Sequence, residues 1–583
     1  MRLGEPSPEG EEATPRPVRF DTWMLLLLTG AVVLRLFLAF RFRSAISFDE
    51  AHYLRLAASF LQHGPFGLMH PYWPPLFPLG IALVEFPVGN FEIAGRLVNI
   101  MAGSCGVALV YHLAGQIFSR REALISAAFA AFYPPLAFHS TNVMPEPLFS
   151  LLALTGMAYG WKALDEKRAV SGLAAGFFWG AAYLVRPEGI GFLLVFAASV
   201  VLLLFIGGLK KSGWRRVAAG ACACCGFVLL AAPYWLYLHE ATGKWTLSTK
   251  GSVNQQLEAS VTFQDQANPD PFYHLTADNK HLPVDMAYHF GTLRELSGLQ
   301  SRSGRVVSMT PAQFAEKYAR NLYHTVKNAV PQALTLVPFV LFIAGLIGSL
   351  YGGRRFGFAL YLLVNLVFFW FLLIPMFHLN ERYFLPLLPV CLIWTGRGTV
   401  SLSRWAAENL AAVLTPRFAR SGWQSGLGAA AVVCFVLGLG FLPEAARFAG
   451  MRTDSPDLWA DPVELKQAGE WLRSHTDHPA ILMDVNKAVD YYAGQYDIRR
   501  GASFSYDSPE RNALYARHRG VEYLVFSSRY LSWYPNLRPL IEKRDLPAGL
   551  VLIYESDQPA GVRTVVYRVV PADSSSSAGE GIR

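Results

Sequence analysis

The sequence predicts a polytopic α-helical membrane protein with a soluble α/β domain at its C-terminal end. Hydrophobic residues make up 52% of the 583 residues and charged residues only 16%, which is too apolar for a soluble chain of this length. Apolar runs long enough to cross a bilayer recur as far as about residue 443. Beyond them the pattern changes to alternating helices and strands, which is typical of a small α/β domain.

About eleven apolar runs are expected to cross the membrane. The first, from Trp23 to Phe40, resembles a secretory signal peptide. It is long, contains Arg35 and lacks a clean cleavage site, so we predict a retained transmembrane helix. The other ten runs lie at approximately 93–118, 123–138, 147–162, 170–185, 189–208, 217–238, 333–350, 358–377, 383–396 and 426–443.

The distribution of Lys and Arg over the short loops predicts the orientation. The loops expected in the cytoplasm carry Arg120-Arg121, Lys167-Arg168, Lys210-Lys211 and Arg354-Arg355. Alternation of the helices then places five segments on the outer side, namely residues 41–90, 139–147, 186–188, 239–330 and 378–382. The protein is therefore predicted to lie in the plasma (inner) membrane, with these segments and the C-terminal domain on the periplasmic side.

The chain divides into four predicted parts. Residues 1–20 are expected to form a disordered cytoplasmic N-terminus and residues 21–445 the transmembrane domain. Residues 446–572 are expected to form the periplasmic α/β domain, and residues 573–583 a disordered tail rich in Ser and Gly. Within the third part, helices are predicted at 462–475, 508–518 and 533–543, and strands at 480–484, 521–527, 550–555 and 563–570.

Residues 60–90 interleave aromatic residues with prolines, so they cannot form one straight helix. We expect short helices that lie in the headgroup plane and cover a cleft. The alternative is an ordinary periplasmic loop with aromatic anchors.

Charged residues recur at helix ends on the predicted outer side, often next to Pro, which restricts the local backbone. Asp49 is a candidate general base for an incoming hydroxyl. Glu50, the second candidate catalytic residue, and Glu146 could hold a divalent cation through carboxylate oxygens. Arg186 and Arg382 could bind phosphate oxygens bidentately. Further candidates for the same site are His52, Tyr53, Arg96, Glu188, His378 and Glu381.

Together these groups suggest transfer of a chemical group away from a phosphate. The sequence has no nucleotide-binding loop or dinucleotide motif, so no nucleotide cofactor is expected and the donor is predicted to be a lipid-linked phosphate. Each residue also has a structural alternative. Arg186 and Glu188 could simply pair with each other, Arg382 could extend to lipid headgroups, and Glu146 could solvate a turn between two prolines.

Five motifs carry a resemblance to a known family. They are FDEAHY at 48–53, YWPPL at 72–76, MPEP at 144–147, RPEG at 186–189 and ERYFLPLLP at 381–389. With these motifs in this order, the sequence resembles polytopic glycosyltransferases of the GT-C superfamily. The resemblance is to the family 39 type, which is related to protein O-mannosyltransferases and to the lipid A aminoarabinose transferase. It covers roughly residues 20–400.

The resemblance implies roles for three of these residues. Asp49 matches the first-loop acidic residue that is the proposed catalytic base of the family. Glu146 stands where the family often has an Asp linked to metal or lipid-phosphate binding. Arg382 would contact the phosphate of a polyprenyl-phosphate sugar donor, and most members of the family invert the anomeric carbon.

We therefore predict a membrane glycosyltransferase of cell-envelope glycosylation. It would move a hexose or pentose from a polyprenyl-phosphate donor to a hydroxyl of an acceptor glycan, lipid or protein. A divalent metal ion is a candidate cofactor. The alternative is a lipid or glycan transporter or flippase without chemistry, which would need polar residues near the bilayer midplane. A non-catalytic assembly protein would leave Asp49 and Glu146 without a role. Basic residues form no block, so no nucleic-acid partner is expected.

Overall fold

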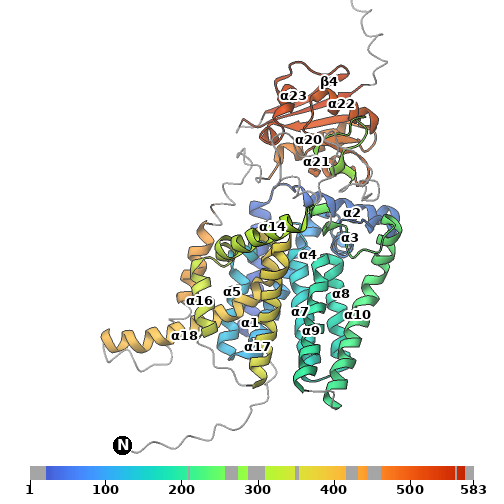
Figure 1. Ribbon diagram of the computed structural model, residues 1–583. Helices are drawn as coiled ribbons and strands as arrows, with labels where there is room; N and C mark the ends of the chain where they lie inside the picture. Colours follow the sequence, from blue (N-terminus) through green and yellow to red (C-terminus); the bar gives the residue numbers. More distant parts are fainter. Residues whose placement is uncertain are drawn as a thin grey trace, which may run out of the picture.

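A computed structural model of the chain is shown in Figure 1. It describes residues 22–207, 211–251, 253–255, 273–286, 309–347, 353–377, 379–414, 431–443, 446, 461–557 and 561–570. The predicted disordered segments at 1–20 and 573–583 lie outside the described residues, and the domain boundary near residue 445 stays a prediction.

The N-terminal two thirds of the chain form a bundle of apolar helices (Figure 1). Its long helices are α1 (Thr22–Phe42), α4 (Phe91–Ile117), α5 (Arg120–Phe132), α7 (Glu146–Asp165), α8 (Ala169–Val185), α9 (Ile190–Gly207), α10 (Lys211–Thr242), α16 (Leu336–Ile347), α17 (Gly353–Val367) and α18 (Leu388–Leu414). Among the described residues, six helices are long and apolar enough to cross a membrane, or seven if the bent pair Pro311–Leu334 and Leu336–Ile347 is one span. The predicted helical membrane fold is confirmed, whereas the number of eleven spans stays a prediction.

Glycines allow α8 and α10 to approach closely. A Cβ atom added to Gly172 or Gly176 would lie only 2.1 or 1.9 Å from the carbonyl oxygens of Ala219 and Ala223. Backbones at this separation are typical of membrane helices that pack through small residues. The close contact fixes α8, and therefore the chain at Arg186 where α8 ends.

Short helices lie at one end of the bundle, between it and the α/β domain (Figure 1). They are α2 (Asp49–His63), η1 (Gly64–Leu68), α3 (Leu76–Val88) and α14 (Pro311–His324). The prediction of several short helices within residues 60–90 is confirmed. Phe66 and Phe86 are 85% and 88% exposed, as expected of aromatic anchors in a headgroup layer.

Further short elements connect the long helices. They are α6 (Pro134–His139), η2 (Pro187–Gly189), α12 (Pro283–Asp285), η5 (Thr325–Ala329), α15 (Val330–Leu334), η6 (Phe368–Leu373), η7 (Ile374–Met376), η8 (Glu381–Tyr383) and η9 (Leu385–Leu387). Of these, η5 and η6 are π-helical. Single π-helical turns inside α-helices occur frequently at functional sites.

The C-terminal domain is a mixed five-stranded sheet with helices against it. Its strands β1 (Leu482–Asp484), β2 (Ala502–Ser503), β3 (Tyr523–Ser527), β4 (Leu550–Asp557) and β5 (Arg563–Val569) have the order β2-β1-β3-β5-β4. β1 is parallel to β2 and β3, whereas β5 is antiparallel to β3 and β4. The helices are α20 (Val463–His475), α21 (Ala488–Tyr492), α22 (Pro509–His518), η10 (Ser528–Tyr530), η11 (Pro535–Leu537) and α23 (Arg538–Glu542).

The predicted α/β fold of this domain is confirmed, including the four predicted strands. The helix predicted at 533–543 is instead two short pieces, η11 and α23, because Pro535 and Pro539 interrupt it. The short elements β2 and α21 were not predicted. Both are only two to five residues long, so they carry no periodic signal.

Candidate active site

Five charged side chains from separate helix ends meet at the end of the bundle that faces the α/β domain. Asp49 is the first residue of α2, and Glu146 is the first residue of α7. Arg186 follows the last residue of α8, Glu188 lies in η2, and Arg382 lies in η8. Helices that alternate in direction bring these ends together, although the residues are up to 333 positions apart in the sequence.

The five side chains form a continuous row of alternating charge, which we call the charged row. Arg382 Nη2 donates to Asp49 Oδ2 at 2.9 Å, and Arg382 Nε lies 3.9 Å from Glu146 Oε1. Arg186 Nη1 donates to the same Glu146 oxygen at 2.7 Å, and Arg186 Nη2 donates to Glu188 Oε1 at 2.9 Å. The order is therefore Asp49, Arg382, Glu146, Arg186 and Glu188, with each guanidinium between two carboxylates.

The middle of the charged row is shielded from water, and an aromatic ring packs against both of its arginines. Only 6% of the Arg186 side chain and 5% of the Glu146 side chain are exposed. The guanidinium carbons of Arg186 and Arg382 lie 4.9 and 5.4 Å from the centre of the Tyr383 ring. Buried charges are tolerated only when they are paired and hydrogen-bonded, and the ring adds a cation–π contact to both arginines.

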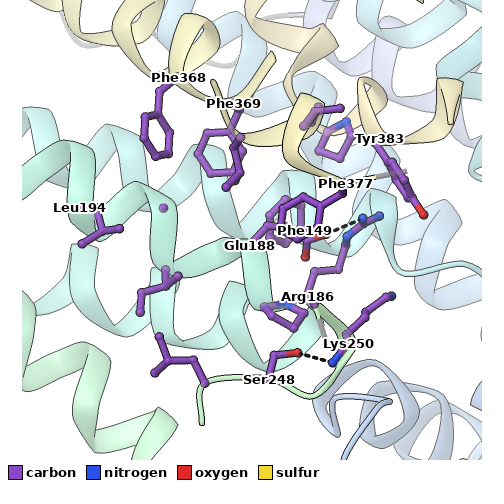
Figure 2. Close-up of a pocket in the computed structure, with 18 of the residues that line it drawn as sticks. Phe149, Arg186, Glu188, Leu194, Ser248, Lys250, Phe368, Phe369, Phe377 and Tyr383 are labelled. Atoms are coloured by element: carbon purple, nitrogen blue, oxygen red, sulfur yellow. Dashed lines mark hydrogen bonds and ion pairs between the residues drawn. The ribbon is translucent and has the colours of Figure 1, made fainter. Parts of the chain in front are cut away.

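A cavity of about 500 Å³ opens at one end of the charged row (Figure 2). Arg186, Glu188 and Lys250 form its charged end. Its other walls are mostly apolar and aromatic, and they include Phe149, Leu194, Phe368, Phe369, Phe377 and Tyr383. The cavity thus joins a cationic end to an elongated apolar surface, a combination that suits an amphipathic ligand.

Lys250 belongs to this cavity although no sequence motif marks it. Its Nζ lies 5.3 Å from the Tyr72 ring centre and 5.5 Å from the Trp73 ring centre, and its backbone N–H donates to Ser248 Oγ at 3.0 Å. Burial, together with the positive charge of Arg186, lowers the pKa of Lys250 from its ordinary value of 10.5. A single Lys in a long loop gives no spacing signal, so sequence reasoning missed it.

Glu50 is adjacent to Asp49 in sequence but has a different environment. Its two carboxylate oxygens accept the backbone N–H groups of Ser47 at 2.9 Å and of Val143 at 2.7 Å. The residue is only 7% exposed, and this burial raises its pKa. Glu50 therefore ties the start of α2 to the turn that precedes Glu146, and it does not line the cavity.

His52 and Tyr53, which follow Asp49 on α2, both pack against Trp73. The His52 ring stacks on Trp73 with their centres 4.9 Å apart, and Tyr53 contacts Trp73 edge-to-face at 5.2 Å. Burial raises the pKa of Tyr53, and the negative charges of Asp49 and Glu146 add to this effect. Tyr53 is therefore a neutral phenol close to the two carboxylates.

Two other predicted residues, Arg96 and Glu381, are not part of the cavity lining. Arg96 Nη2 pairs with Glu92 at 2.5 Å and its Nη1 donates to the Arg43 carbonyl at 3.4 Å, so Arg96 stabilises the start of α4. Glu381 is an exposed residue at the start of η8. His378 lies outside the described residues.

The arrangement of Glu50 and Glu146 does not fit a divalent cation. Such an ion takes about six to eight oxygen ligands when it is Ca²⁺, or about six in octahedral geometry when it is Mg²⁺. Glu146 faces two guanidiniums, and both Glu50 oxygens accept backbone N–H groups. Within the described ranges, no three His, Cys, Asp or Glu side chains are grouped closely enough to hold a metal ion. We therefore assign no metal-binding role to these two residues.

Comparison with known proteins agrees with the resemblance of the motifs. A family model described as dolichyl-phosphate-mannose-protein mannosyltransferase matches residues 70–237. No curated protein sequence matches the chain.

Solved structures with the same fold extend over almost the whole chain. One is ArnT from Cupriavidus metallidurans bound to undecaprenyl phosphate, at 13% identity and a TM-score of 0.53, covering 93% of this chain and 98% of that one. Another is the oligosaccharyltransferase AglB from Archaeoglobus fulgidus in complex with an inhibitory peptide and a dolichol-phosphate. It has 11% identity and a TM-score of 0.52, and the match covers 93% of this chain and 74% of that one.

The chain therefore has the fold of the GT-C superfamily, as its motifs predicted. The family-model match at 70–237 begins just before YWPPL and ends within α10. It includes Glu146, Arg186 and Glu188 of the charged row.

Proposed function

We propose that the protein is a membrane glycosyltransferase that moves a sugar from a polyprenyl-phosphate donor to an acceptor hydroxyl. One observation carries this proposal, namely the charged row that links Asp49 to the cavity of about 500 Å³. It combines a carboxylate for proton removal, two guanidiniums and a lysine for a phosphate, and an apolar wall for a lipid chain.

The charged end and the apolar walls of the cavity determine the orientation of the donor in it. Its phosphate lies at the end formed by Arg186 and Lys250, where the guanidinium fork and the ammonium bind anionic oxygens. Its isoprenoid chain lies along Leu194, Phe368 and Phe369 toward the membrane. The ArnT structure with undecaprenyl phosphate and the AglB structure with dolichol-phosphate support a lipid phosphate as the ligand.

Asp49 acts as the general base in this reaction. Its carboxylate takes the proton of the acceptor hydroxyl as the hydroxyl oxygen forms a bond to the anomeric carbon. The bond between that carbon and the phosphate oxygen breaks, and its electron pair leaves with the lipid phosphate. Arg186, Arg382 and Lys250 stabilise the charge that develops on this leaving group. Attack from the face opposite the phosphate inverts the anomeric carbon.

The ion pair between Asp49 and Arg382 links donor binding to base activation. In the structure the Asp49 carboxylate accepts a hydrogen bond from Arg382 at 2.9 Å, so one of its oxygens is already occupied by a donor. A donor phosphate competes with Asp49 for the same guanidinium. Donor binding therefore frees the carboxylate for the acceptor hydroxyl.

The reaction takes place at the outer face of the plasma membrane in this proposal. The charged row and the α/β domain lie at one end of the bundle, and the basic loop containing Lys167 and Arg168 follows the other end of α7. A lipid-linked donor can reach such a site without a cytoplasmic nucleotide.

The transporter alternative has less support. It needs titratable groups in the middle of the membrane helices. Arg35 of α1 is such a group, but it donates to the carbonyls of Ala31, Ala130 and Ala131 and to Ser140 Oγ. Its donors thus hold neighbouring helices together, and the charged row lies at one end of the bundle.

A transfer assay tests the proposal. Purified protein in lipid is incubated with radiolabelled polyprenyl-phosphate sugars and an envelope extract, with and without chelator. Label is expected to move covalently to an extract component, and Asp49→Asn should lower the rate by about 10²–10⁴-fold. Glu166→Gln, at the far end of α7, is the matched control and should transfer normally. Flipping of the lipid in sealed vesicles without covalent transfer would establish the transporter instead.

A further inference from the structure

The segment that carries Asp49 is held by the C-terminal α/β domain. We call residues 43–55 the Asp49 segment. It connects α1 to the first turns of α2, and its backbone and side chains bond to the α/β domain at three separate places. These contacts join residues more than 400 positions apart.

The first contact fixes a strained backbone. Phe48, the residue before Asp49, has φ 40° and ψ −113°, a conformation that only Gly adopts easily. Such strain persists only where the surroundings impose it. Its position is informative, because φ and ψ of Phe48 set the direction in which α2 begins and thus where Asp49 points.

Asn486 provides the bonds that impose this conformation. Its Oδ1 accepts the backbone N–H of Phe48 at 2.8 Å, and its Nδ2 donates to Ser47 Oγ at 3.1 Å and to Tyr530 Oη at 3.0 Å. Asn486 is 1% exposed, so its amide group has little access to water. The Phe48 ring also packs against Tyr530 and Trp533, with ring centres 6.2 and 6.0 Å away.

The second contact lies before Phe48 in the sequence. Asp461 accepts hydrogen bonds from Arg43 Nη1 at 2.7 Å and from the backbone N–H of Ser44 at 2.7 Å. Tyr492 Oη accepts the backbone N–H of Ile46 at 2.9 Å.

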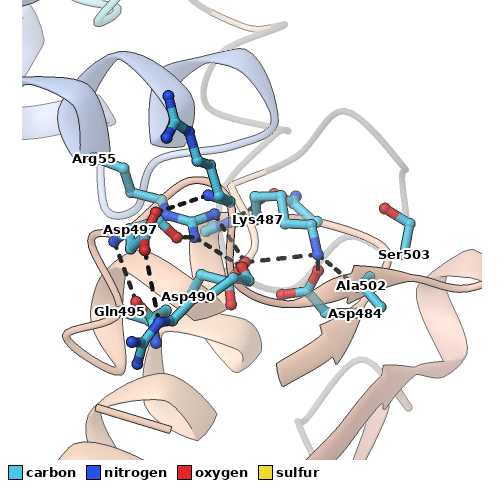
Figure 3. A network of polar contacts seen from close by, with 12 residues as sticks. Arg55, Asp484, Lys487, Asp490, Gln495, Asp497, Ala502 and Ser503 are labelled. Atoms are coloured by element: carbon cyan, nitrogen blue, oxygen red, sulfur yellow. Dashed lines mark hydrogen bonds and ion pairs between the residues drawn. The ribbon is translucent and has the colours of Figure 1, made fainter. Parts of the chain in front are cut away.

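The third contact lies after Asp49, on α2 (Figure 3). Arg55 Nη1 pairs with Asp490 at 3.0 Å, and both side chains are fully buried. Arg55 Nη2 donates to the carbonyl of Asp497 at 2.6 Å, and Lys487 lies between Asp490 and Asp484. Removing one partner of a buried pair leaves an uncompensated charge and is strongly destabilising, so this contact attaches α2 firmly to the α/β domain.

We propose that the α/β domain is a positioning domain for Asp49 and that Asn486 is its principal positioning residue. This inference rests on the proposed role of Asp49 as the base. Without the Asn486 bond, the Phe48 backbone relaxes to a negative φ and the first turn of α2 rotates. The Asp49 carboxylate then leaves its place beside Arg382, and a displacement of about 1 Å in a reacting group can cost about 10²-fold in rate.

Three variants of the full chain test the inference. Asn486→Leu removes the acceptor for Phe48, whereas Asn486→Asp keeps an oxygen there. Asn512→Leu is the matched control, because Asn512 is also a fully buried Asn of this domain but bonds only to residues 505–508. The measurements are kcat, the Kd for polyprenyl phosphate, the melting temperature, and hydrogen–deuterium exchange of peptides covering residues 43–55.

The expected pattern separates positioning from folding. Asn486→Leu should lower kcat by at least about tenfold and raise exchange in residues 43–55. It should not raise the Kd for polyprenyl phosphate, because Arg382 loses a competing carboxylate when Asp49 moves away. Asn486→Asp should regain most of the kcat. Asn512→Leu should lower the melting temperature without changing kcat or exchange in that segment. If Asn486→Leu does not fold, Tyr530→Phe removes one of the two acceptors of Asn486 Nδ2 and should raise exchange in the same segment.

Two results would overturn the inference. One is unchanged exchange of residues 43–55 in Asn486→Leu, and the other is raised exchange with unchanged kcat. The exchange measurement does not depend on turnover. A wild-type protein that transfers no sugar therefore refutes the proposed function, while the exchange still decides whether the domain holds the segment.

Discussion

At the scale of single residues, charge balance organises the site. Each guanidinium of the charged row lies between two carboxylates, so the row carries little net charge before a donor binds. Lys250 adds a cation at the cavity end. At Lys250 an incoming phosphate thus meets a cation that has no carboxylate partner among the described ion pairs. At Arg186 and Arg382 the phosphate competes with carboxylates for the guanidiniums.

Replacing Arg186 tests how strongly the row depends on this balance. Arg186→Ala leaves Glu188 and Glu146 buried with fewer partners, so the free energy of unfolding should fall by about 3–5 kcal/mol. Arg168→Ala is the control, because Arg168 pairs with Glu166 at 3.3 Å but is 73% exposed, and it should change stability by no more than about 1 kcal/mol. Thermal unfolding in detergent measures both. Equal melting temperatures for the two variants would show that the buried pairs contribute little.

The lowered pKa of Lys250 predicts a pH dependence of donor binding. Protonated Lys250 attracts the phosphate, and the charge is lost as pH rises through a pKa that lies below 10.5. Affinity for polyprenyl phosphate should therefore fall as pH rises from that pKa toward 10.5. Lys250→Arg keeps its charge and should bind with little pH dependence over the same range.

Stability should change in the opposite direction over this window. The unfolded chain binds a proton that the folded chain has lost, so the free energy of unfolding should rise with pH. Titrations of Kd and of melting temperature from pH 7 to 10 measure the two trends. Parallel pH profiles for the wild type and Lys250→Arg would contradict the placement of the phosphate at Lys250.

At the scale of elements, the positions of the side chains in the charged row depend on how closely helices pack. α8 ends at Arg186, and its glycines leave no space against α10. α2 begins at Asp49, and its start is fixed by Glu50 and the α/β domain. Arg186 is thus positioned by helix contacts several turns away, and Asp49 by the contacts of its two neighbours in the sequence.

Two glycine substitutions should have opposite effects. A Cβ on Gly176 would lie 1.9 Å from the carbonyl oxygen of Ala223, so Gly176→Ala must separate α8 from α10 and should cost about 1–3 kcal/mol. Gly106 of α4 has no atom within 4 Å of the added carbon, so Gly106→Ala should stabilise the helix by about 0.5–1 kcal/mol. Transfer activity should fall only in Gly176→Ala, because Arg186 moves with α8. Similar melting temperatures and activities for both would rule out the helix packing as the cause.

The sequence allowed the meeting of helix ends to be predicted, but not the individual contacts. Alternation of the helices predicts Asp49, Arg186 and Arg382 at one end of the bundle, and Asp49 pairs with Arg382 there while Glu146 lies between the two arginines. Which carboxylate each arginine would contact depends on packing distances that composition does not encode.

Other contacts differ in how far the sequence alone can predict them. The pair of Glu92 and Arg96 has the four-residue spacing of a helical ion pair, so it could have been predicted. The bond from Phe48 to Asn486 spans 438 positions, and nothing in the sequence singles out that Asn. A single chain gives no signal for such long-range contacts.

At the scale of the whole molecule, the two ends of the bundle differ in the charged residues that they carry. The end near the α/β domain holds the charged row (Figure 1). The loop between α7 and α8 at the other end contains Lys167 and Arg168. Because basic loops remain in the cytoplasm during insertion, the site is expected to face the periplasm.

Labelling of single cysteines tests this orientation. In a variant whose six cysteines are replaced, Ser474→Cys marks an exposed position of the α/β domain and Arg168→Cys marks the exposed α7–α8 loop. A membrane-impermeant maleimide applied to spheroplasts should label the first and should label the second only after permeabilisation. The α/β domain lies at one end of the bundle and the α7–α8 loop at the other, so each labelled position is the control for the other. Labelling in the reverse order would place Asp49 in the cytoplasm, where nucleotide sugars are available, and would remove the reason for a lipid-linked donor.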